Sequence, residues 1–460
     1  MKKRILAVIL AGFTAVSCLS GCKSKEASKT DVTKITMWTA NSHSKLEMEN
    51  LVNEFNRTVG KEKGIEFEYI IKENDLAKQV EIALSTNQAP DFFGGVDLEK
   101  GVQNDYIAPI EDLPGGDELI KKYDGRLTEG WHTYNGKTYR LPVSVTTMGL
   151  IYNKDMFKAA GIVDEKGEAK APETVAEMVE DAKKLTDAKK REYGIILPLK
   201  WSAWFGYDVD RVVMPSVGFS GYNPKDGTFD YSGYKPLLEA IMQIKSDGSY
   251  YPGAEGIDND PARARFAEGN IGMKIGYSWD VGVLNDQFPA KCDWGVAPIP
   301  TYTADEKYLQ PTQPSWSPSI NKKSLETKDK EKLMTVFEWF VGDDLSRELY
   351  KRGVQIPFDY SVIDGVEPGS DVKKGWKEFG ELLKISTDLS PTIKTDTDGK
   401  TTIAKNFVNS VWTGKMSIDE LIADANKVYN DGAKKYKDLH PDYDTSTVIN
   451  PDYNVKRQEG

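Results

Sequence analysis

The stretch Lys34-Ile-Thr-Met-Trp-Thr39 opens the part of the sequence that decides the fold, because its composition predicts a buried strand. Further along the chain, apolar residues at helical spacing over 51–59 predict a helix that two glycines end. A second strand is predicted over 65–71, a second helix over 76–84 and a third strand over 91–96. Strand–helix–strand–helix–strand is typical of a parallel sheet with helices on its faces, so the fold class is α/β.

The rest of the chain continues the α/β pattern. Extended backbone is predicted over 141–152 and a strand over 193–197. The predicted helices are residues 174–185, 262–267, 330–341 and 418–429. The polar tail after Lys434 has no clear periodicity, so no element is predicted there. At 460 residues with 39% hydrophobic content, the chain can form two or more domains.

The first residues have the layout of a secretion signal. Positive residues at positions 2–4 precede an apolar run over 5–16, which is shorter than the roughly 20 residues of a membrane span. Leu19-Ser20-Gly21-Cys22 follows, and it is similar to the bacterial lipobox, whose cysteine receives a diacylglyceryl group. We expect a lipoprotein signal peptide over 1–21, lipid attachment at Cys22 and a solvated tether over 22–33. The protein would then face the extracytoplasmic side of the cell membrane.

Composition limits the classes of partner. The formal net charge is −11, and it becomes −14 once the three positive residues of the leader are removed. Such acidity argues against nucleic acid, which requires a basic face. Because Cys18 leaves with the leader and Cys22 carries lipid, Cys292 is alone and no intrachain disulfide is expected.

Signatures of catalysis and metal binding are missing from the sequence pattern. His43, His132 and His440 are widely separated and give no ligand cluster of recognisable spacing. We therefore expect no catalytic residues, no metal and no cofactor. A glycosidase needs only two facing carboxylates, which a single sequence does not identify, so a lipid-anchored glycoside hydrolase stays open as an alternative.

Aromatic residues favour a binding function. The chain has ten Trp and 22 Tyr, and four Trp stand in polar or glycine-rich surroundings: Trp201, Trp204, Trp279 and Trp316. An indole ring offers a flat apolar face to the C–H groups of a sugar, while neighbouring polar groups bind its hydroxyls. The alternative for each ring is a place in the core, since Trp is highly buried on average.

Eight segments carry a resemblance through their order and spacing rather than through any one of them. They are Lys34–Trp38, Ala89–Asp91, Tyr134–Pro142, Leu150–Phe157, Pro172–Thr174, Phe266–Asn270 with its continuation to Trp279, Gly295–Pro300 and Ser317–Asn321. Together they resemble the extracellular solute-binding lipoproteins of carbohydrate ABC importers, the family 1 group that includes maltodextrin-binding proteins.

The resemblance implies a periplasmic-binding-protein-like fold, with two α/β lobes joined by a hinge that the chain crosses near 142–147, 297–302 and 354–358. The lobes that it implies are residues 34–144 plus 301–355 and residues 145–300 plus 356–460. A sugar or oligosaccharide would lie between the lobes and favour their closure. The membrane subunits of the importer would then recognise the closed form of this monomeric, non-catalytic protein.

The resemblance also implies polar contacts to the ligand. Asn41, Ser42 and His43 follow the first strand, where the family places such contacts, and Asp97 follows the third. Thr146 stands where maltodextrin binders carry a carboxylate, so that contact is weakened or lost.

Stacking positions are carried over in the same way. Trp204 matches an aromatic platform, and Trp279 followed by Asp280 matches the Gly-x-x-Trp stacking position of the second lobe. The aromatic pair of maltodextrin binders is missing near 401–402, which argues against maltodextrin itself. Other stacking rings would then be Trp201 and Trp316.

Two further alternatives stay open besides the hydrolase. The first is a different solute, such as a polyol, a sugar phosphate or a polyamine. A sugar phosphate would require a cationic cleft, and a polyamine would require several carboxylates beside the Trp residues. The second is a surface adhesin or structural lipoprotein, for which no closure on a ligand is expected.

Overall fold

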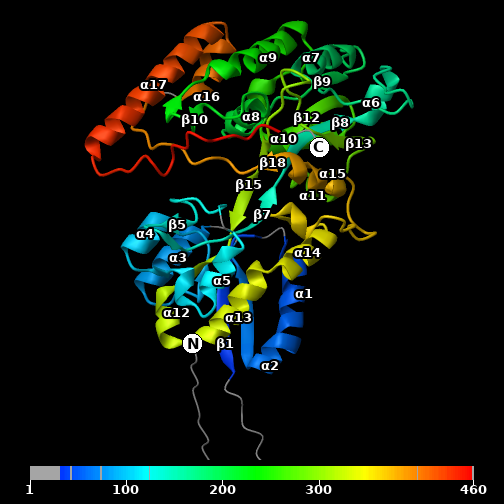
Figure 1. The fold of residues 1–460 in the computed structure, drawn as a ribbon. Coiled ribbons are helices and arrows are strands. Elements are labelled where there is room, and N and C mark those ends of the chain that lie inside the picture. The colour runs from blue at the N-terminus through cyan, green and yellow to red at the C-terminus, as the bar shows by residue number, and fades with distance from the viewer. Residues whose placement is uncertain (1–31, 42–43, 73–74, 124, 401, 458–460) are drawn as a thin grey trace, which may run out of the picture.

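The structure is a computed structural model of the chain, and it describes residues 32–41, 44–72, 75–123, 125–400 and 402–457. The predicted signal peptide, Cys22, Ser42 and His43 lie outside the described residues. Figure 1 shows two bodies, one above the other, which extended strands join near the middle. We call the lower body the first lobe and the upper body the second lobe.

The first lobe is built on a five-stranded sheet in the order β2-β1-β3-β16-β4. Its strands are β1 (Thr33–Thr39), β2 (Ile65–Ile71), β3 (Phe92–Phe93), β4 (Ile107–Ala108) and β16 (Ser319–Asn321). β1 pairs in parallel with β2 and β3, as predicted, whereas β16 runs antiparallel to β3 and β4. β3 is shorter than the predicted 91–96, because Gly95 takes a left-handed conformation with φ +79° that turns the chain away from the sheet.

Helices cover this sheet and bury its apolar residues. Ile35, Met37 and Phe92 are fully buried, and α1 packs Met48 and Phe55 into the same core. The helices are α1 (Lys45–Phe55), α2 (Lys61–Lys63), α3 (Leu76–Ser85), α4 (Leu98–Gln103), α5 (Gly116–Lys121), α12 (Lys322–Thr327), α13 (Lys330–Val341) and α14 (Asp343–Lys351). A small hairpin, β5 (Thr133–Tyr134) and β6 (Lys137–Thr138), lies beside α4.

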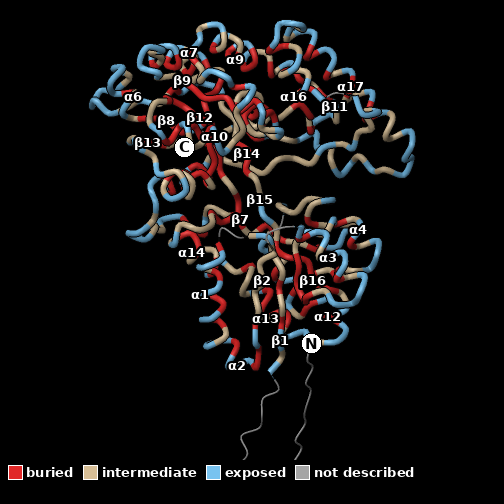
Figure 2. The backbone as a smooth tube through the Cα atoms, turned by 180° about the vertical axis from the view of Figure 1, so that it is seen from behind, coloured by how far each residue is buried: buried red, intermediate tan, exposed pale blue. Residues whose placement is uncertain are grey.

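The second lobe has a four-stranded sheet in the order β13-β8-β12-β9. Its strands are β8 (Met148–Asn153), β9 (Tyr193–Ile195), β12 (Ile271–Tyr277) and β13 (Trp294–Ala297). Every residue of β12 is buried, which is the pattern of a central strand covered on both faces. In Figure 2 the buried segments, drawn in red, run through the interior of both lobes.

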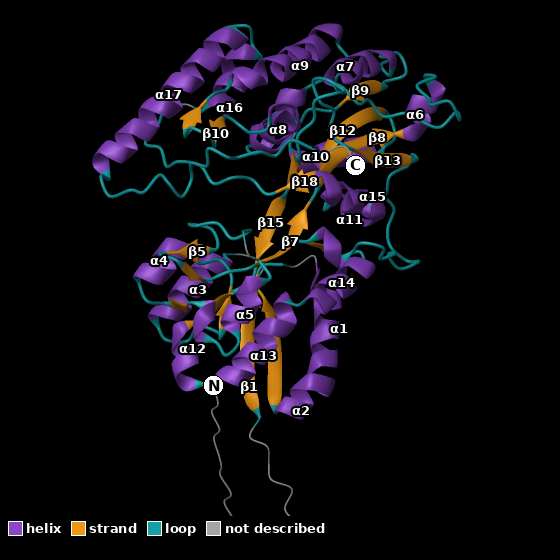
Figure 3. Cartoon of the chain, viewed as in Figure 1, coloured by secondary structure: helices purple, strands orange, loops and turns teal. Residues whose placement is uncertain are grey.

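The helices of the second lobe surround its sheet (Figure 3). They are α6 (Lys154–Ala159), α7 (Val175–Lys184), α8 (Arg211–Val217), α9 (Lys235–Asp247), α10 (Asn259–Ala267), α11 (Asp280–Gly282), α15 (Trp376–Glu381), α16 (Ile403–Asn406) and α17 (Ile418–Leu439). The short strands are β10 (Tyr222–Asn223), β11 (Thr228–Phe229), β14 (Gln310–Pro311) and β18 (Ser386–Thr387). Among the described residues, no helix has the length and hydropathy needed to cross a membrane.

A three-stranded sheet forms the hinge. β7 (Pro142–Thr146) pairs antiparallel with β15 (Gln313–Trp316) on one side and with β17 (Ile356–Pro357) on the other. Figure 3 shows β7 and β15 running between the two lobes. The chain thus crosses at β7 and β17, close to the first and third expected positions.

The middle crossing lies at β15, so the prediction of a crossing at 297–302 is wrong. Ile299 belongs to the core of the second lobe, and the Val175 N–H donates to the Thr301 carbonyl at 2.8 Å. β14 pairs in parallel with β18, and the Gln310 side chain donates to the Met148 carbonyl, so the chain stays on the second lobe up to β14. Residues 301–312 therefore contact the second lobe rather than the first. Pro298 and Pro300 follow the end of β13 at Ala297 and do not mark a hinge.

The C-terminal segment has more structure than its sequence pattern indicates. α17 continues to Leu439, ten residues past the predicted end at Tyr429. Gly432 permits a close approach in which the Asp396 N–H donates to its carbonyl at 3.0 Å. The chain then returns along the second lobe, where the Leu309 N–H donates to the Val455 carbonyl at 2.9 Å.

Candidate functional site

A cavity of about 1280 Å³ opens between the lobes beside the hinge sheet. We call it the hinge cavity. Its lining includes Asn41 and Gly95 from the first lobe, Thr146, Gln313 and Trp316 from the hinge strands, and Trp279 from the second lobe. The structure thus brings together four of the predicted ligand contacts, which come from segments far apart in the sequence.

Trp279 stands at the end of the central strand of the second lobe, two residues after β12. Its ring centroid lies 4.7 Å from that of Tyr277, with an interplanar angle of 31°, and 5.6 Å from that of Tyr207. The indole is half-buried and lines the hinge cavity. Its Nε1 is buried without an acceptor in the described part of the chain. The tyrosines hold the ring in place at the cavity wall, as a stacking platform requires.

Asp280 does not line the hinge cavity, and the prediction that it binds ligand hydroxyls is wrong. Its side chain is 1% exposed. Oδ1 accepts from Arg263 Nε at 2.6 Å, while Oδ2 lies 3.4 Å from Lys274 Nζ and accepts from the Tyr277 N–H at 3.1 Å. β12 carries Lys274 into the interior, and the carboxylate is needed there to neutralise the buried cations.

Asp208 lies close to the same charges. Burial raises the pKa of its carboxyl to about 7, although the positive charge of Lys274 opposes the shift, as do those of Arg263 and Arg211. The negative charge of Asp280 adds to the shift. Near neutral pH the protein therefore holds a buried carboxyl that is partly protonated.

This raised pKa predicts a pH-dependent stability that Asp208→Asn removes. Between about pH 4 and 7 the folded state holds a proton that the unfolded state has released, so stability falls as the pH rises. We expect the wild type to lose stability relative to Asp208→Asn by up to about 1.4 kcal/mol per pH unit in this window. Urea denaturation of both proteins between pH 5 and 8 measures the difference. Parallel stability profiles would contradict the prediction.

Trp204 is a core residue, and the prediction that it forms a ligand platform is wrong. The residue is 1% exposed, and its ring packs 5.9 Å from that of Phe407 and 6.1 Å from that of Phe205. Trp201 stacks on Tyr207 at 5.0 Å and 27°, but it does not line the cavity. The aromatic support of Trp279 thus includes Tyr207, which sequence reasoning missed.

Trp316 is held by residues of the first lobe. Its ring makes an edge contact with His132 at 4.7 Å and a tilted contact with Trp131 at 5.9 Å. Burial and the charge of Arg140 lower the pKa of His132 to about 4, while its Nδ1 accepts from the Thr128 N–H at 2.9 Å. The imidazole is therefore neutral at physiological pH and acts as a fixed support for the indole.

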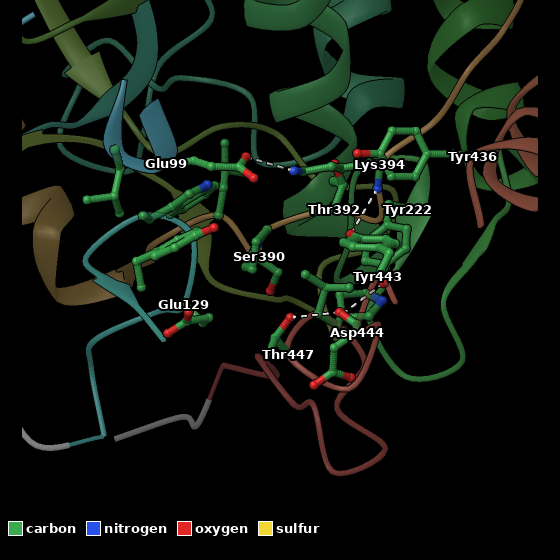
Figure 4. Close-up of a pocket in the computed structure, with 18 of the residues that line it drawn as sticks. Glu99, Glu129, Tyr222, Ser390, Thr392, Lys394, Tyr436, Tyr443, Asp444 and Thr447 are labelled. Carbon is green, nitrogen blue, oxygen red and sulfur yellow. Dashed lines mark hydrogen bonds and ion pairs between the residues drawn. The ribbon is translucent and has the colours of Figure 1, made fainter. Parts of the chain in front are cut away.

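A second cavity, of about 1270 Å³, lies between the lobes on the side of the C-terminal tail. We call it the tail cavity (Figure 4). Asp97 lines this cavity rather than the hinge cavity, and it caps α4 by accepting from the Lys100 N–H at 2.9 Å. Lys394 of the second lobe and Glu99 of α4 face each other across it, with 3.2 Å between Nζ and Oε2. The two cavities have nearly the same volume, and the gathering of Trp279, Trp316 and Asn41 selects the hinge cavity as the candidate site.

Comparison with known proteins identifies the family. The sequence model of the bacterial extracellular solute-binding proteins matches residues 50–378. The chain is 24% identical to a maltotriose-binding protein of Pyrococcus abyssi over 355 residues, which cover 76% of this chain and 69% of the relative. It is also 24% identical to a maltodextrin-binding protein of Bacillus subtilis over 328 residues, covering 66% and 70% respectively.

Solved structures confirm the two-lobed α/β fold. A cyclic α-maltosyl-1,6-maltose binding protein of Arthrobacter globiformis matches with a TM-score of 0.62 and 17% identity over 88% of this chain and 100% of that chain. A raffinose complex of the solute-binding protein RafE matches with a TM-score of 0.58 and 17% identity over 87% and 100%. The chain belongs to the bacterial extracellular solute-binding proteins, a family of binding proteins rather than enzymes that acts outside the cytoplasm.

Proposed function

We propose that this protein captures a sugar or an oligosaccharide in the hinge cavity and delivers it to the membrane subunits of an ABC importer. The observation that carries the proposal is the pairing of indole rings with neutral polar side chains in one cavity between the lobes. Trp279 and Trp316 offer flat apolar faces, and Asn41, Thr146 and Gln313 offer hydrogen-bonding groups. The names of the relatives, which bind maltotriose and maltodextrin, support a carbohydrate over another solute.

A thermal-shift screen against a library of sugars tests the proposal. A ligand that binds only the folded protein raises its apparent stability, by about 2.7 kcal/mol at a hundredfold excess over Kd. We expect at least one neutral sugar to raise the Tm, with putrescine, spermidine and glycerol phosphates as controls. Stabilisation by these controls alone would favour the other solute classes, and release of product from an oligosaccharide would favour a hydrolase.

Binding is expected to bring the two lobes together. The hinge is a narrow sheet of three strands, and the cavity wall is shared between both lobes, so a solute that contacts both walls favours a closed arrangement. Small-angle scattering should show a smaller radius of gyration at saturating sugar than without it. An unchanged profile at saturation would count against closure.

We also propose that the protein acts as a monomer anchored to the outer face of the cell membrane through lipid on Cys22. The Leu19–Cys22 box and the short apolar run before it support the anchor. Cys22→Ala should therefore move the protein from the detergent phase to the aqueous phase when it is expressed in a host that processes lipoproteins. A mutant that partitions with membranes as the wild type does would contradict the anchor.

A further inference from the structure

The side-chain amide of Gln313 has a fixed orientation in the wall of the hinge cavity. Gln313 lies on β15, directly opposite Thr146 of β7. Its Oε1 accepts two hydrogen bonds, from Tyr207 Oη at 2.6 Å and from Arg211 Nη1 at 3.2 Å. A guanidinium only donates, so the oxygen of the amide has to face Arg211, and a flipped amide would set two donors against each other.

The two donors are themselves held in place by the second lobe. The Arg211 guanidinium lies 4.1 Å from the centroid of the Tyr207 ring, and Trp201 stacks on that ring at 5.0 Å. Tyr207 belongs to the π-helical turn Phe205–Asp210, and α8 begins with Arg211 directly after it. The amide oxygen of Gln313 is thus bound to a rigid aromatic and cationic group.

The amide nitrogen is left to face the cavity. Both lone pairs of Oε1 are used, and among the residues that the structure describes no hydrogen bond from Nε2 is recorded. Because Gln313 lines the hinge cavity, its two N–H donors have only water or a solute as acceptors. A donor that loses water on closure without gaining an acceptor is destabilising, so a matching solute has to offer an oxygen at this point.

We propose that Gln313 determines specificity by donating from Nε2 to an acceptor oxygen of a neutral sugar that lies against Trp279. This inference rests on the proposed function and narrows it. A sugar hydroxyl, ring oxygen or glycosidic oxygen accepts these bonds, and Thr146 opposite adds a hydroxyl rather than a charge. A polyamine, whose ammonium groups only donate, finds no acceptor at Gln313 itself. The hinge cavity is also lined by the carboxylates of Glu47, Asp260, Asp286 and Asp371. Spermidine is therefore the solute that tests this selection.

Gln313→Glu separates recognition from structural support. The carboxylate keeps an oxygen for Tyr207 and Arg211, and the bond to Arg211 becomes charge-assisted, but no N–H remains to donate. We expect affinity for a bound sugar to fall at least about tenfold, while the Tm stays equal or rises. If Gln313 had a structural role alone, the Gln313→Glu protein would keep the wild-type affinity for the sugar.

Gln310 provides the matched control. Its Oε1 accepts from the Ile299 N–H at 2.7 Å and its Nε2 donates to the Met148 carbonyl at 3.0 Å, so both ends of its amide are bonded inside the second lobe. Gln310→Glu removes the donor to Met148 and should lower the Tm with affinity unchanged. The two glutamine variants therefore have opposite expected effects on affinity and stability.

The measurement is calorimetric titration of the wild type and both variants with maltotriose, raffinose and a chitin oligosaccharide, with spermidine as the cationic probe. If the wild type binds a sugar and Gln313→Glu binds it with unchanged affinity, this inference is overturned and the proposed function stands. Wild type that binds none of the sugars, or only spermidine, overturns the proposed function and this inference with it. If Gln313→Glu does not fold, Gln313→Ala decides: at least tenfold weaker binding supports the inference, and wild-type affinity overturns it.

Discussion

Replacing Asp280 with alanine is expected to destabilise the fold by about 3–5 kcal/mol, because it removes the buried carboxylate that pairs with both Arg263 and Lys274. The Arg263 side chain is 13% exposed and that of Lys274 is 4% exposed, so water cannot solvate either charge adequately. The Tyr277 N–H also loses its acceptor at the end of the central strand. Urea denaturation of the variant measures the loss in the free energy of unfolding.

Asp260 offers a matched control for this prediction. It pairs with the same Arg263, at 2.8 Å, but its side chain is 62% exposed. Exposed ion pairs contribute about 0–1 kcal/mol, so Asp260→Ala should hardly change the unfolding free energy. If Asp280→Ala and Asp260→Ala lost the same free energy of unfolding, the burial of Asp280 would not explain the loss. The loss would then come from the unpaired Arg263 alone.

Trp279→Ala is expected to weaken sugar binding by about 1–3 kcal/mol, by analogy with the stacking of nucleic-acid bases on aromatic side chains. This corresponds to roughly a tenfold to hundredfold increase in Kd. The physical reason is the loss of the flat apolar face that the ring presents at the cavity wall. Calorimetric titration with a sugar that binds the wild type measures the effect.

Trp204 supplies the contrasting variant. Its ring is buried between Phe205 and Phe407, so Trp204→Ala should cost about 3–5 kcal/mol of stability and leave affinity nearly intact in the folded fraction. Trp279 is only half-buried, and its alanine variant should lose less stability than that of Trp204. An unchanged affinity in Trp279→Ala would remove this residue from the site.

Elements with strong local periodicity could be predicted from the sequence. β2 and α13 have the predicted bounds, and β1 differs from its prediction by one residue, because alternating or helical apolar spacing marks each of them. The last ten residues of α17 have a weaker pattern. These residues contact a distant segment of the chain, for example through the ion pair of 2.9 Å between Lys435 and Asp396. Such contacts cannot be predicted from the local sequence.

The candidate site was predicted in part for the same reason. Trp279 and Trp204 both stand in polar local sequence, but Phe407, about 200 positions further along the chain, covers only Trp204. Asp280 is adjacent to Trp279, yet its partner Arg263 comes from a different helix. Gln313 gave no sequence signal, because its role follows from Tyr207 and Arg211, which only the folded chain brings beside it.

The place where β1 begins decides how far the first lobe can lie from a lipid anchor on Cys22. Thr39 lines the hinge cavity, so Thr33 lies at the opposite end of the strand, about 20 Å further from the cavity and at the base of the first lobe (Figure 1). If lipid on Cys22 anchors the protein as proposed, covalent geometry lets the eleven residue steps from Cys22 to Thr33 span at most about 40 Å. A protein held in this way would meet a permease by diffusion in the plane of the membrane, so a freely diffusing Cys22→Ala protein would have to be more abundant to supply the same import rate.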